Sequence, residues 1–453
     1  MFIVWRLVMY ELEVAVSKNN DAIEKDYNKC IQCGYCKKVC VDEIISSKLL
    51  EKKKDAEPLC INCGQCSNIC PTEAIHEKFD YLKVKEILKN RDDKKIIISV
   101  APAVRVALGE DLGFEVGVNL EKKIPDILRT LGADYVFDIT FGADLTIMEE
   151  AMEFANRIKN NTRIPQFTSC CPAWVKYCEI FYPSLLNNLS TAKSPISMQS
   201  SIIKTYFAQI SGINPQDIIN IVVAPCTAKK TEINRKELSV TEKDTDFILT
   251  TRELALLIKE DNINIENISD SNFDSPISTG SGAGVIFGSS GGVCEATLRT
   301  AYYYLTGNNL ENIEFTELRE IKGIKEASIS VNNKEIKVAV CNGIRNAKVL
   351  IEKILKDESY YDFIEVMSCT GGCIAGGGQP KATMLYMAET KEARSNALYS
   401  EDEKMNVRLC HENIEIKELY EKFLKEPNSD IAKKILHTKY EDKSYLLRGE
   451  THA

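Results

Sequence analysis

The chain has 453 residues, of which 44% are hydrophobic and 27% are charged, and its formal net charge is −9 at pH 7. At roughly 150 residues per domain, this length suggests about two to four domains, and the composition is that of an ordinary soluble globular protein. The acidic charge argues against a nucleic-acid partner, which would favour a basic face. No apolar run approaches the ~18 residues of a membrane-spanning helix and residues 1–10 lack a signal-peptide pattern, so we expect a cytoplasmic protein with no membrane association.

Cysteine is unusually frequent. The chain has 17 cysteines, and eight of them fall between Cys30 and Cys70. In a long chain without an export signal, such a cluster is more typical of metal ligands in a reducing compartment than of disulfides. The four histidines are scattered, which disfavours haem and His-rich zinc or copper sites.

The first feature along the chain, after an N-terminal segment 1–20, is a repeat. The run CIQCGYCKKVC starts at Cys30 and CINCGQCSNIC starts at Cys60, which predicts a small α+β, ferredoxin-like module over residues 21–82. Zinc ribbons use pairs of cysteines, whereas Cys-x2-Cys-x2-Cys-x3-Cys is the pattern of two-cluster ferredoxins, in which the fourth cysteine of each run ligates the other [4Fe–4S] cluster. Gly34 and Gly64 allow the backbone to turn toward cluster sulfurs. We therefore expect one cluster on Cys30, Cys33, Cys36 and Cys70, and a second on Cys60, Cys63, Cys66 and Cys40.

Residues 83–95 are charged and are predicted as a linker whose first half forms a helix. The pattern then changes to apolar strands alternating with amphipathic helices, which predicts an α/β domain over residues 96–411 with mainly parallel sheets flanked by helices. Residues 264–284 are predicted as a long loop, and the tail 412–453 as two short helices broken near Pro427. The predicted strands are 96–104, 135–139, 218–225, 337–341 and 362–369, and the predicted helices are 144–159, 251–259 and 344–355.

Three segments that follow apolar strands carry cysteines: PQFTSCCPAW, VVAPCTAKKTE and EVMSCTGGCIAGGGQP. Ligands bind outside the carboxyl ends of strands in open α/β sheets, so these thiols can meet at one site. Cys171, Cys226, Cys369 and Cys373 are then candidate ligands of a further [4Fe–4S] cluster, with Lys229 as its counter-charge. The alternative is that they are inert buried thiols, which are common.

These three segments resemble the signature segments of [FeFe]-hydrogenases, and the resemblance runs from about Cys30 to the C-terminal tail. It implies a catalytic domain of two lobes and an H-cluster, which is a [4Fe–4S] cubane linked to a two-iron unit with CO, CN and azadithiolate ligands. By matching, Cys373 is the bridging thiolate, and Cys171, Cys226 and Cys369 complete the cubane. Dedicated maturation proteins install the two-iron unit in this family.

The resemblance also implies the residues around the two-iron unit. Lys229 and Ser194, together with the backbone near Ala101 and Pro102, match the pocket for the cyanides. Phe287 matches an aromatic residue beside the two irons, and Met367 and Ser368 are expected to contact the cofactor.

A proton route is implied in the same way. Cys170 matches the thiol that exchanges protons with the bridge amine, and Glu150, Ser190, Glu153 and Arg157 match the outward route. Spacings of three and four residues place Glu150, Glu153 and Arg157 on one helical face. Without the resemblance, that face would be interpreted as a solvated stripe with a Glu153–Arg157 ion pair.

The sequence departs from the best-known hydrogenases at Ala224, Ile196, Cys294 and Ser368, where they carry Met, Gln, Met and Ala. These departures suggest a divergent, group B-like member and bear on catalytic bias, since residues around a metal site tune it. They leave the cluster ligands and the proton route intact.

The predicted function is therefore an iron hydrogenase that catalyses 2H⁺ + 2e⁻ ⇌ H₂. The N-terminal clusters would carry electrons to or from ferredoxin or a similar small redox protein. One alternative is a sensor of H₂ or redox state with the same cofactor, although no signalling domain is evident. The other is a non-enzymatic iron–sulfur cluster assembly protein, although Cys170, Lys229 and the GGCIAGGG loop are all present.

Overall fold

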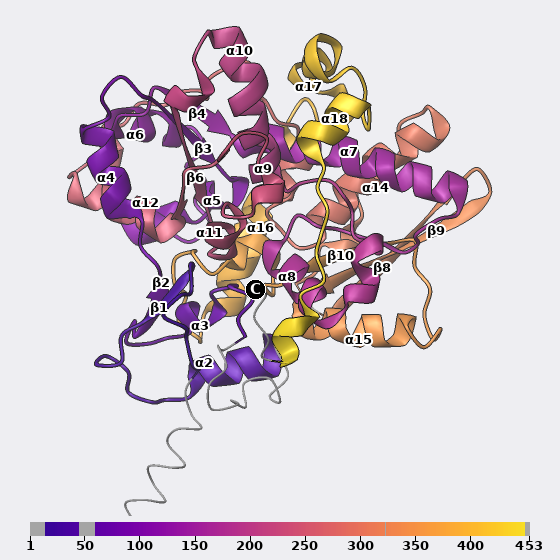
Figure 1. Cartoon of the computed structure of the whole chain (residues 1–453), viewed down its shortest axis with the longest axis horizontal. Helices are drawn as coiled ribbons and strands as arrows, with labels where there is room; N and C mark the ends of the chain where they lie inside the picture. The colour runs from indigo at the N-terminus through magenta and orange to yellow at the C-terminus, as the bar shows by residue number, and fades with distance from the viewer. Residues whose placement is uncertain (1–13, 45–58, 322, 449–453) are drawn as a thin grey trace, which may run out of the picture.

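The computed structural model describes residues 14–44, 59–321 and 323–448. They form a small N-terminal module and two lobes, each lobe built on its own four-stranded sheet, and Figure 1 shows the module (indigo) beneath both lobes. This is the α/β architecture expected from the sequence. Most of the predicted N-terminal segment lies outside the described residues. Within the described ranges, no helix is long and apolar enough to cross a membrane.

The N-terminal module repeats one small unit around a two-stranded antiparallel sheet. Strand β1 (Ile23–Lys25) pairs with β2 (Ile75–Glu77). Each cysteine run turns into a short helix, and the residues before these helices, Gly34 and Gly64, have φ values of 81° and 71°. Such positive φ values favour glycine, as the sequence predicted for these turns. The helices are α2 (Tyr35–Lys38), continued by η1 (Val39–Ile44), and α3 (Gln65–Asn68).

The first lobe has a fully parallel sheet in the order β4-β3-β6-β7. Its strands are buried on both faces, which explains why β3 and β6 are nearly continuous apolar runs, interrupted within the strands only by Ser99 and Asn220. The expected strand at 96–104 is shorter, because Pro102 begins helix α5. The segment predicted as a linker contributes α4, whose Val84 is fully buried in the core of this lobe. The elements are β3 (Lys95–Val100), β4 (Tyr135–Asp138), β6 (Ile218–Ala224), β7 (Phe247–Thr250), α4 (Tyr81–Lys89), α5 (Pro102–Arg105), α6 (Ile124–Leu131), α11 (Ala228–Glu232) and α12 (Thr251–Glu260).

The second lobe has a mixed sheet in the order β5-β10-β9-β8. Only β8 is antiparallel, and it joins β9 through Asn332 and Asn333, which both have positive φ as a tight hairpin turn requires. Strands β5, β7 and β8 were not predicted from the sequence, because the first two are short and β8 alternates buried with exposed residues. The elements are β5 (Gln166–Phe167), β8 (Ile324–Val331), β9 (Lys334–Asn342), β10 (Phe363–Met367), α8 (Pro172–Phe181) and α15 (Ile344–Ile354).

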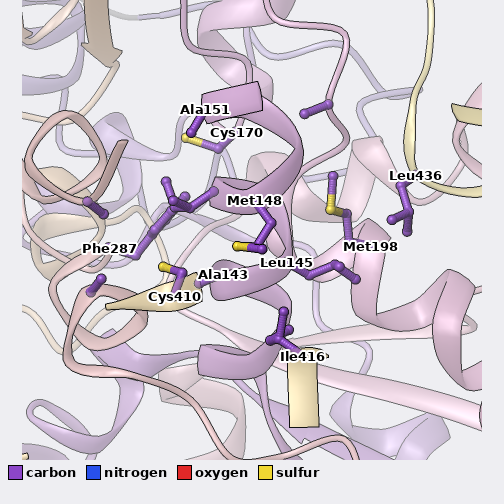
Figure 2. Close-up of a cluster of buried hydrophobic side chains, with 14 of the residues drawn as sticks. Ala143, Leu145, Met148, Ala151, Cys170, Met198, Phe287, Cys410, Ile416 and Leu436 are labelled. Carbon is purple, nitrogen blue, oxygen red and sulfur yellow. The ribbon is translucent and has the colours of Figure 1, made fainter. Parts of the chain in front are cut away.

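Helix α7 (Ile139–Asn160) is the longest helix in the described part of the chain and packs against α9, α13 and α14. It begins five residues before the predicted start, because the Asp138 side chain caps it by accepting a hydrogen bond from the Thr140 amide. Figure 2 shows side chains of α7 in one buried cluster with Cys170, Phe287 and Cys410. The helices around this cluster are α9 (Pro195–Ile202), continued by η5 (Ile203–Phe207) and α10 (Ala208–Ser211), α13 (Gly282–Ile286) and α14 (Gly292–Thr306).

The C-terminal tail packs on this assembly. Helix α16 (Met387–Lys404) contacts α13, and the tail then forms α17 (Ile414–Leu419) with η12 (Tyr420–Leu424) and α18 (Asp430–Leu436). The two helical segments lie on either side of Pro427, as predicted. After α18 the chain runs down past α8 as an extended segment, yellow in Figure 1.

Candidate active site

Four thiols meet where strands of both sheets end. Cys226 follows β6 of the first lobe, Cys171 follows β5 of the second, and Cys369 and Cys373 follow β10. They are close enough for their charges to interact. Burial raises the pKa of the Cys373 thiol most, and the charges of Cys226 and Cys171 raise it further. Within the described ranges, no three His, Cys, Asp or Glu side chains are arranged to hold a single metal ion. A [4Fe–4S] cluster takes four cysteine thiolates, so the number and type of these side chains match such a cluster.

A cavity of about 80 Å³ lies beside Cys373, between the two lobes. Its walls are mainly small and apolar, and Lys229 is the one charged side chain among the described residues that line it. The sequence-predicted residues that line it are Cys170, Cys171, Cys226, Cys373, Ala101, Pro102, Lys229, Phe287 and Met367, and the departures Ile196 and Ala224 also line it.

Two predicted cofactor contacts lie just outside this lining. The Ser194 hydroxyl caps helix α9 by accepting a hydrogen bond from the Ser197 amide. The Ser368 hydroxyl accepts a hydrogen bond from the Cys171 thiol, with 3.4 Å between the sulfur and oxygen atoms. Ser368 is therefore placed on the side of the four thiols rather than on the side of the cavity.

Lys229 is buried and oriented by two contacts. Its ammonium donates to the Cys170 carbonyl oxygen at 3.2 Å and lies 2.7 Å from a carboxylate oxygen of Glu232. Burial opposes the charge, but Glu232 keeps the pKa of Lys229 above its ordinary value. An ammonium has three N–H groups, so one remains for a ligand in the cavity. The residues present thus fit an anionic, sulfur-ligated cofactor of the kind that the sequence implies.

The module brings together both predicted sets of cysteines. A cavity of about 20 Å³ is lined by Cys30, Cys33, Cys36 and Cys70. The thiols of the other set lie close enough for their charges to interact. Burial raises the pKa of the Cys66 thiol most, and the charges of Cys60, Cys63 and Cys40 raise it further. This set also lies near the four-thiol site between the lobes, since the charge of Cys226 helps to raise the pKa of the Cys63 thiol.

The module contacts the four-thiol site directly through residues that were not predicted from the sequence. The Gln65 amide donates to the Cys369 sulfur at 3.1 Å and to the Ala375 carbonyl oxygen at 2.9 Å. A Cβ atom on Gly64 would lie only 2.8 Å from Cα of Gly377, so the two backbones are in close contact. Nothing local in the sequence distinguishes Gln65 from an ordinary surface glutamine.

Arg252 hydrogen-bonds both to the module and to the segment that follows Cys373. Its guanidinium donates to Glu77 at 2.5 Å and to the carbonyl oxygens of Gly377 and Gln379 at 2.7 Å each. Glu77 is only 1% exposed. The ion pair is therefore buried, which makes either partner costly to remove alone.

The structure brings the residues of the predicted proton route close to one another. Glu150 is 1% exposed, and burial raises its pKa to about 8, although hydrogen bonding with the Ser190 hydroxyl lowers it in part. The Ser190 hydroxyl donates its single hydrogen to Glu153 at 3.3 Å, and Arg157 donates to Glu153 at 2.6 Å. Cys170 is close enough to Glu150 for their charges to interact. Because Glu150 and Arg157 are buried, this face of α7 is not a solvated stripe.

Three further polar residues, which the sequence analysis did not single out, adjoin the outer end of this route. Thr191 donates to Glu153 from its backbone amide at 2.9 Å and its hydroxyl oxygen lies 3.1 Å away. His437 lies between the Thr191 hydroxyl, at 2.7 Å, and Glu149, at 2.8 Å. The scattered positions of the four histidines gave no signal for this placement.

Comparisons with known proteins cover nearly all of the chain. Residues 94–377 match the family model described as iron only hydrogenase large subunit, C-terminal domain. Residues 388–443 match the iron hydrogenase small subunit, and residues 29–75 match a 4Fe-4S dicluster domain. In this chain, the segment that matches the small-subunit model lies in the same polypeptide as the segment that matches the large-subunit model.

Several hydrogenases are similar over most of the chain. Iron hydrogenase 1 of Clostridium pasteurianum is 42% identical over 441 residues, which cover 94% of this chain and 77% of that protein. The NADP-reducing hydrogenase subunit HndD of Solidesulfovibrio fructosivorans is 45% identical over 368 residues, covering 79% of this chain and 62% of that subunit. A variant of the [FeFe]-hydrogenase HydA1 from Chlamydomonas reinhardtii superposes with a TM-score of 0.72 at 38% identity, covering 80% of this chain and 99% of that one. The similarity extends to the cytosolic iron-sulfur assembly component 3 of Bos taurus, 30% identical over 360 residues, which cover 77% of this chain and 74% of that protein.

Proposed function

This chain belongs to the iron-only hydrogenase family, and on that premise we propose that it catalyses 2H⁺ + 2e⁻ ⇌ H₂ at an H-cluster held between the two lobes. The observation that carries the proposal is the cavity in which Cys373 adjoins Cys170 and Lys229. It combines a cofactor thiolate, a proton-exchanging thiol and a cation in one apolar enclosure. Two [4Fe–4S] clusters in the N-terminal module would relay electrons to it.

Cys171, Cys226, Cys369 and Cys373 would hold the cubane of the H-cluster, and Cys373 would link it to the two-iron unit. When bound, this group supplies the redox-active irons at which electrons and protons combine. Lys229 would donate its remaining N–H to an anionic ligand of the group. The apolar walls, including Phe287, exclude water and so strengthen that interaction.

Cys170, Glu150, Ser190, Glu153 and Arg157 would move protons between the cavity and the surface. A relay residue works best when its pKa lies near the working pH, because it must both take and give a proton. Glu150 meets this condition, since burial raises its pKa to about 8. Ser190 connects it to Glu153 through hydrogen bonds that a hydroxyl can give and receive.

Electrons would enter at the cluster held by Cys30, Cys33, Cys36 and Cys70, because Cys33 is the exposed cysteine of the described chain. Large apolar side chains surround it in sequence and are exposed: Tyr27 at 61%, Ile31 at 64% and Tyr35 at 39%. We propose that ferredoxin or a similar small redox protein docks on this face, with the exposed Lys29 and Lys38 beside acidic groups of the partner. Maturation proteins would deliver the two-iron unit in a reducing, cytoplasmic setting, which agrees with the absence of disulfides among the 17 cysteines, all of which are described.

The departures from the family pattern support a divergent, group B-like hydrogenase. Ala224 and Ile196 line the cavity, so they can alter catalytic bias while every ligand and relay residue is kept. An iron–sulfur assembly role requires neither the Cys170 thiol nor a Lys229 ammonium at a cavity. A sensor would keep both with slow turnover, so the rate of turnover separates it from an enzyme.

The deciding experiment is hydrogen evolution from dithionite-reduced methyl viologen by anaerobically purified protein loaded with the two-iron cofactor. We expect rapid evolution, accompanied by infrared bands of bound CO and CN, and uptake assays would then define the direction. The matched control is Cys170→Ser, which should retain the bands but lose turnover. Bands without turnover in the unmodified protein would favour the sensor, and absent bands would favour the assembly protein.

A further inference from the structure

The C-terminal segment after α18 covers the outer end of the proposed proton route. The Lys193 amide donates to the Leu436 carbonyl at 2.9 Å, and the Thr438 amide donates to the Thr191 carbonyl at 2.8 Å. The Tyr440 hydroxyl donates to the Ser190 carbonyl at 3.0 Å. Residues 436–440 therefore lie along residues 190–193, which is the segment that contacts Glu153.

His437 of this segment is held between groups of helix α7. One ring nitrogen, Nε2, lies 2.8 Å from Glu149, whose carboxylate also accepts hydrogen bonds from the Tyr420 hydroxyl and the Asn428 amide. The other, Nδ1, lies 2.7 Å from the Thr191 hydroxyl. The His437 side chain is 8% exposed and Glu149 is fully buried. Water therefore has little access to either group, and each depends on the other as a hydrogen-bond partner.

The hydrogen of the Thr191 hydroxyl can serve only one acceptor at a time. When His437 is neutral, its Nε2–H donates to Glu149, so its bare Nδ1 takes the hydrogen of Thr191. When His437 is protonated, its Nδ1–H donates to Thr191, and the hydroxyl hydrogen turns to Glu153 at 3.1 Å. The protonation of His437 thus decides whether Glu153 receives the hydroxyl hydrogen bond.

We propose that His437 is a positioning residue for proton delivery: in its protonated form it directs the Thr191 hydroxyl onto Glu153 and makes Glu153 a stronger acid toward Glu150. A hydrogen bond to a carboxylate favours the ionised form, so Glu153 releases its proton more readily in that state. The proposal therefore predicts stronger inward delivery at pH values low enough to protonate His437.

Other charges near His437 belong to the same network. Glu149 faces it directly, and Arg157 donates to Glu153 rather than to the histidine. Lys193, beside the segment, directs its ammonium to the Ser201 hydroxyl at 3.1 Å, and Lys433 contacts His437 only through its backbone carbonyl. Within the described residues, Glu149 is therefore the ionic partner of the imidazole that the hydrogen bonds identify.

The inference rests on the proposed hydrogenase function, and the test compares Thr191→Val with Thr191→Ser in the cofactor-loaded full chain. Valine removes the connecting hydroxyl and serine keeps it. We expect Thr191→Val to evolve hydrogen about fivefold more slowly than Thr191→Ser near pH 5.5, which is the effect of one ordinary hydrogen bond, and the two rates to converge above about pH 8. His437→Gln should reproduce the loss, and adding Thr191→Val to it should change nothing further. Thr438→Val, which alters the same segment at a hydroxyl bonded to Glu237, should keep the profile of the unmodified protein.

A second readout does not depend on turnover. The chain has four histidines, so ¹⁵N-histidine labelling gives a simple spectrum in which His437→Gln identifies the His437 signals. At high pH we expect the Nε2–H tautomer with a hydrogen-bonded Nδ1, and loss of that bond in Thr191→Val. An active enzyme whose His437 signals ignore Thr191→Val, or parallel pH profiles for valine and serine, would overturn the inference. A responsive His437 in a protein that evolves no hydrogen would support the coupling and count against the hydrogenase proposal.

Discussion

Replacing Glu150 with Gln should stabilise the fold at neutral and alkaline pH while it abolishes efficient proton transfer. Burial is the largest influence on this carboxyl group and raises its pKa from 4.5 to about 8. The unfolded chain therefore releases the proton above pH 4.5, whereas the folded protein keeps it until about pH 8. Stability from this group is fully present below pH 4.5 and is lost as the pH rises through that interval.

The magnitude follows from the same interval. Each pH unit in it lowers the free energy of unfolding by about 1.4 kcal/mol, so about 4 kcal/mol is lost between pH 5 and pH 8. With an unfolding entropy of about 2.1 cal/mol/K per residue over 453 residues, this corresponds to a fall of about 4 °C in Tm. Glutamine does not ionise, so the Glu150→Gln variant lacks this contribution.

The assay is thermal denaturation of the cluster-loaded protein at several pH values. Glu150→Gln and the unmodified protein share every other titrating group, so the difference between their Tm values reports on Glu150 alone. The difference in Tm between Glu150→Gln and the unmodified protein should grow by about 4 °C from pH 5 to pH 8. The exposed Glu392→Gln is the matched control and should show no such trend. Turnover of Glu150→Gln should fall by about two orders of magnitude or more, as expected for loss of a proton carrier. Parallel Tm profiles would refute the assignment of Glu150 as a carboxyl group that stays protonated at neutral pH.

Three other predictions concern the N-terminal module. Gln65→Leu removes a hydrogen bond to Cys369, so the midpoint potential of the loaded cubane should fall by about 40 mV in an infrared-monitored redox titration, whereas an unchanged midpoint would mean that this bond has no electronic role. Arg252→Met leaves the buried Glu77 carboxylate unpaired and should lower the free energy of unfolding by about 3–5 kcal/mol, with partial recovery when Glu77→Gln is added; a neutral single variant would contradict the buried ion pair. Ile31→Glu should raise KM for ferredoxin about tenfold and leave the methyl viologen rate unchanged, and an equal loss with both donors would place the docking face elsewhere.

The features that were predictable from sequence are those written in local spacing. The cysteine runs indicate which thiols share a turn. The apolar strands before Cys171, Cys226 and Cys369 indicate that these cysteines lie at the carboxyl ends of the strands. Those signals suffice for the α/β class and for the convergence of the four thiols. They do not reveal β8, because a half-exposed edge strand such as Ile324–Val331 lacks a continuous apolar run.

The features that sequence alone did not reveal depend on contacts between distant segments. Gln65 and Cys369 are 304 residues apart, and His437 and Glu149 are 288 residues apart. A polar side chain in such a contact looks like any surface residue until the fold buries it. Arg252 is a further example, because on the sequence it is merely a charged residue in the first turn of an amphipathic helix.

The four departures from the family pattern separate once their positions are known. Ala224 and Ile196 line the cavity, and the Ser368 hydroxyl lies 3.4 Å from the Cys171 sulfur, so each of these three can act on a bound cofactor directly. Cys294 lies outside the cavity lining, and its backbone amide donates to the buried Glu365 at 2.8 Å. Any side chain at position 294 can make that backbone contact. Altered catalytic bias should therefore follow substitutions at positions 224, 196 and 368, and a change at 294 should act through core packing instead.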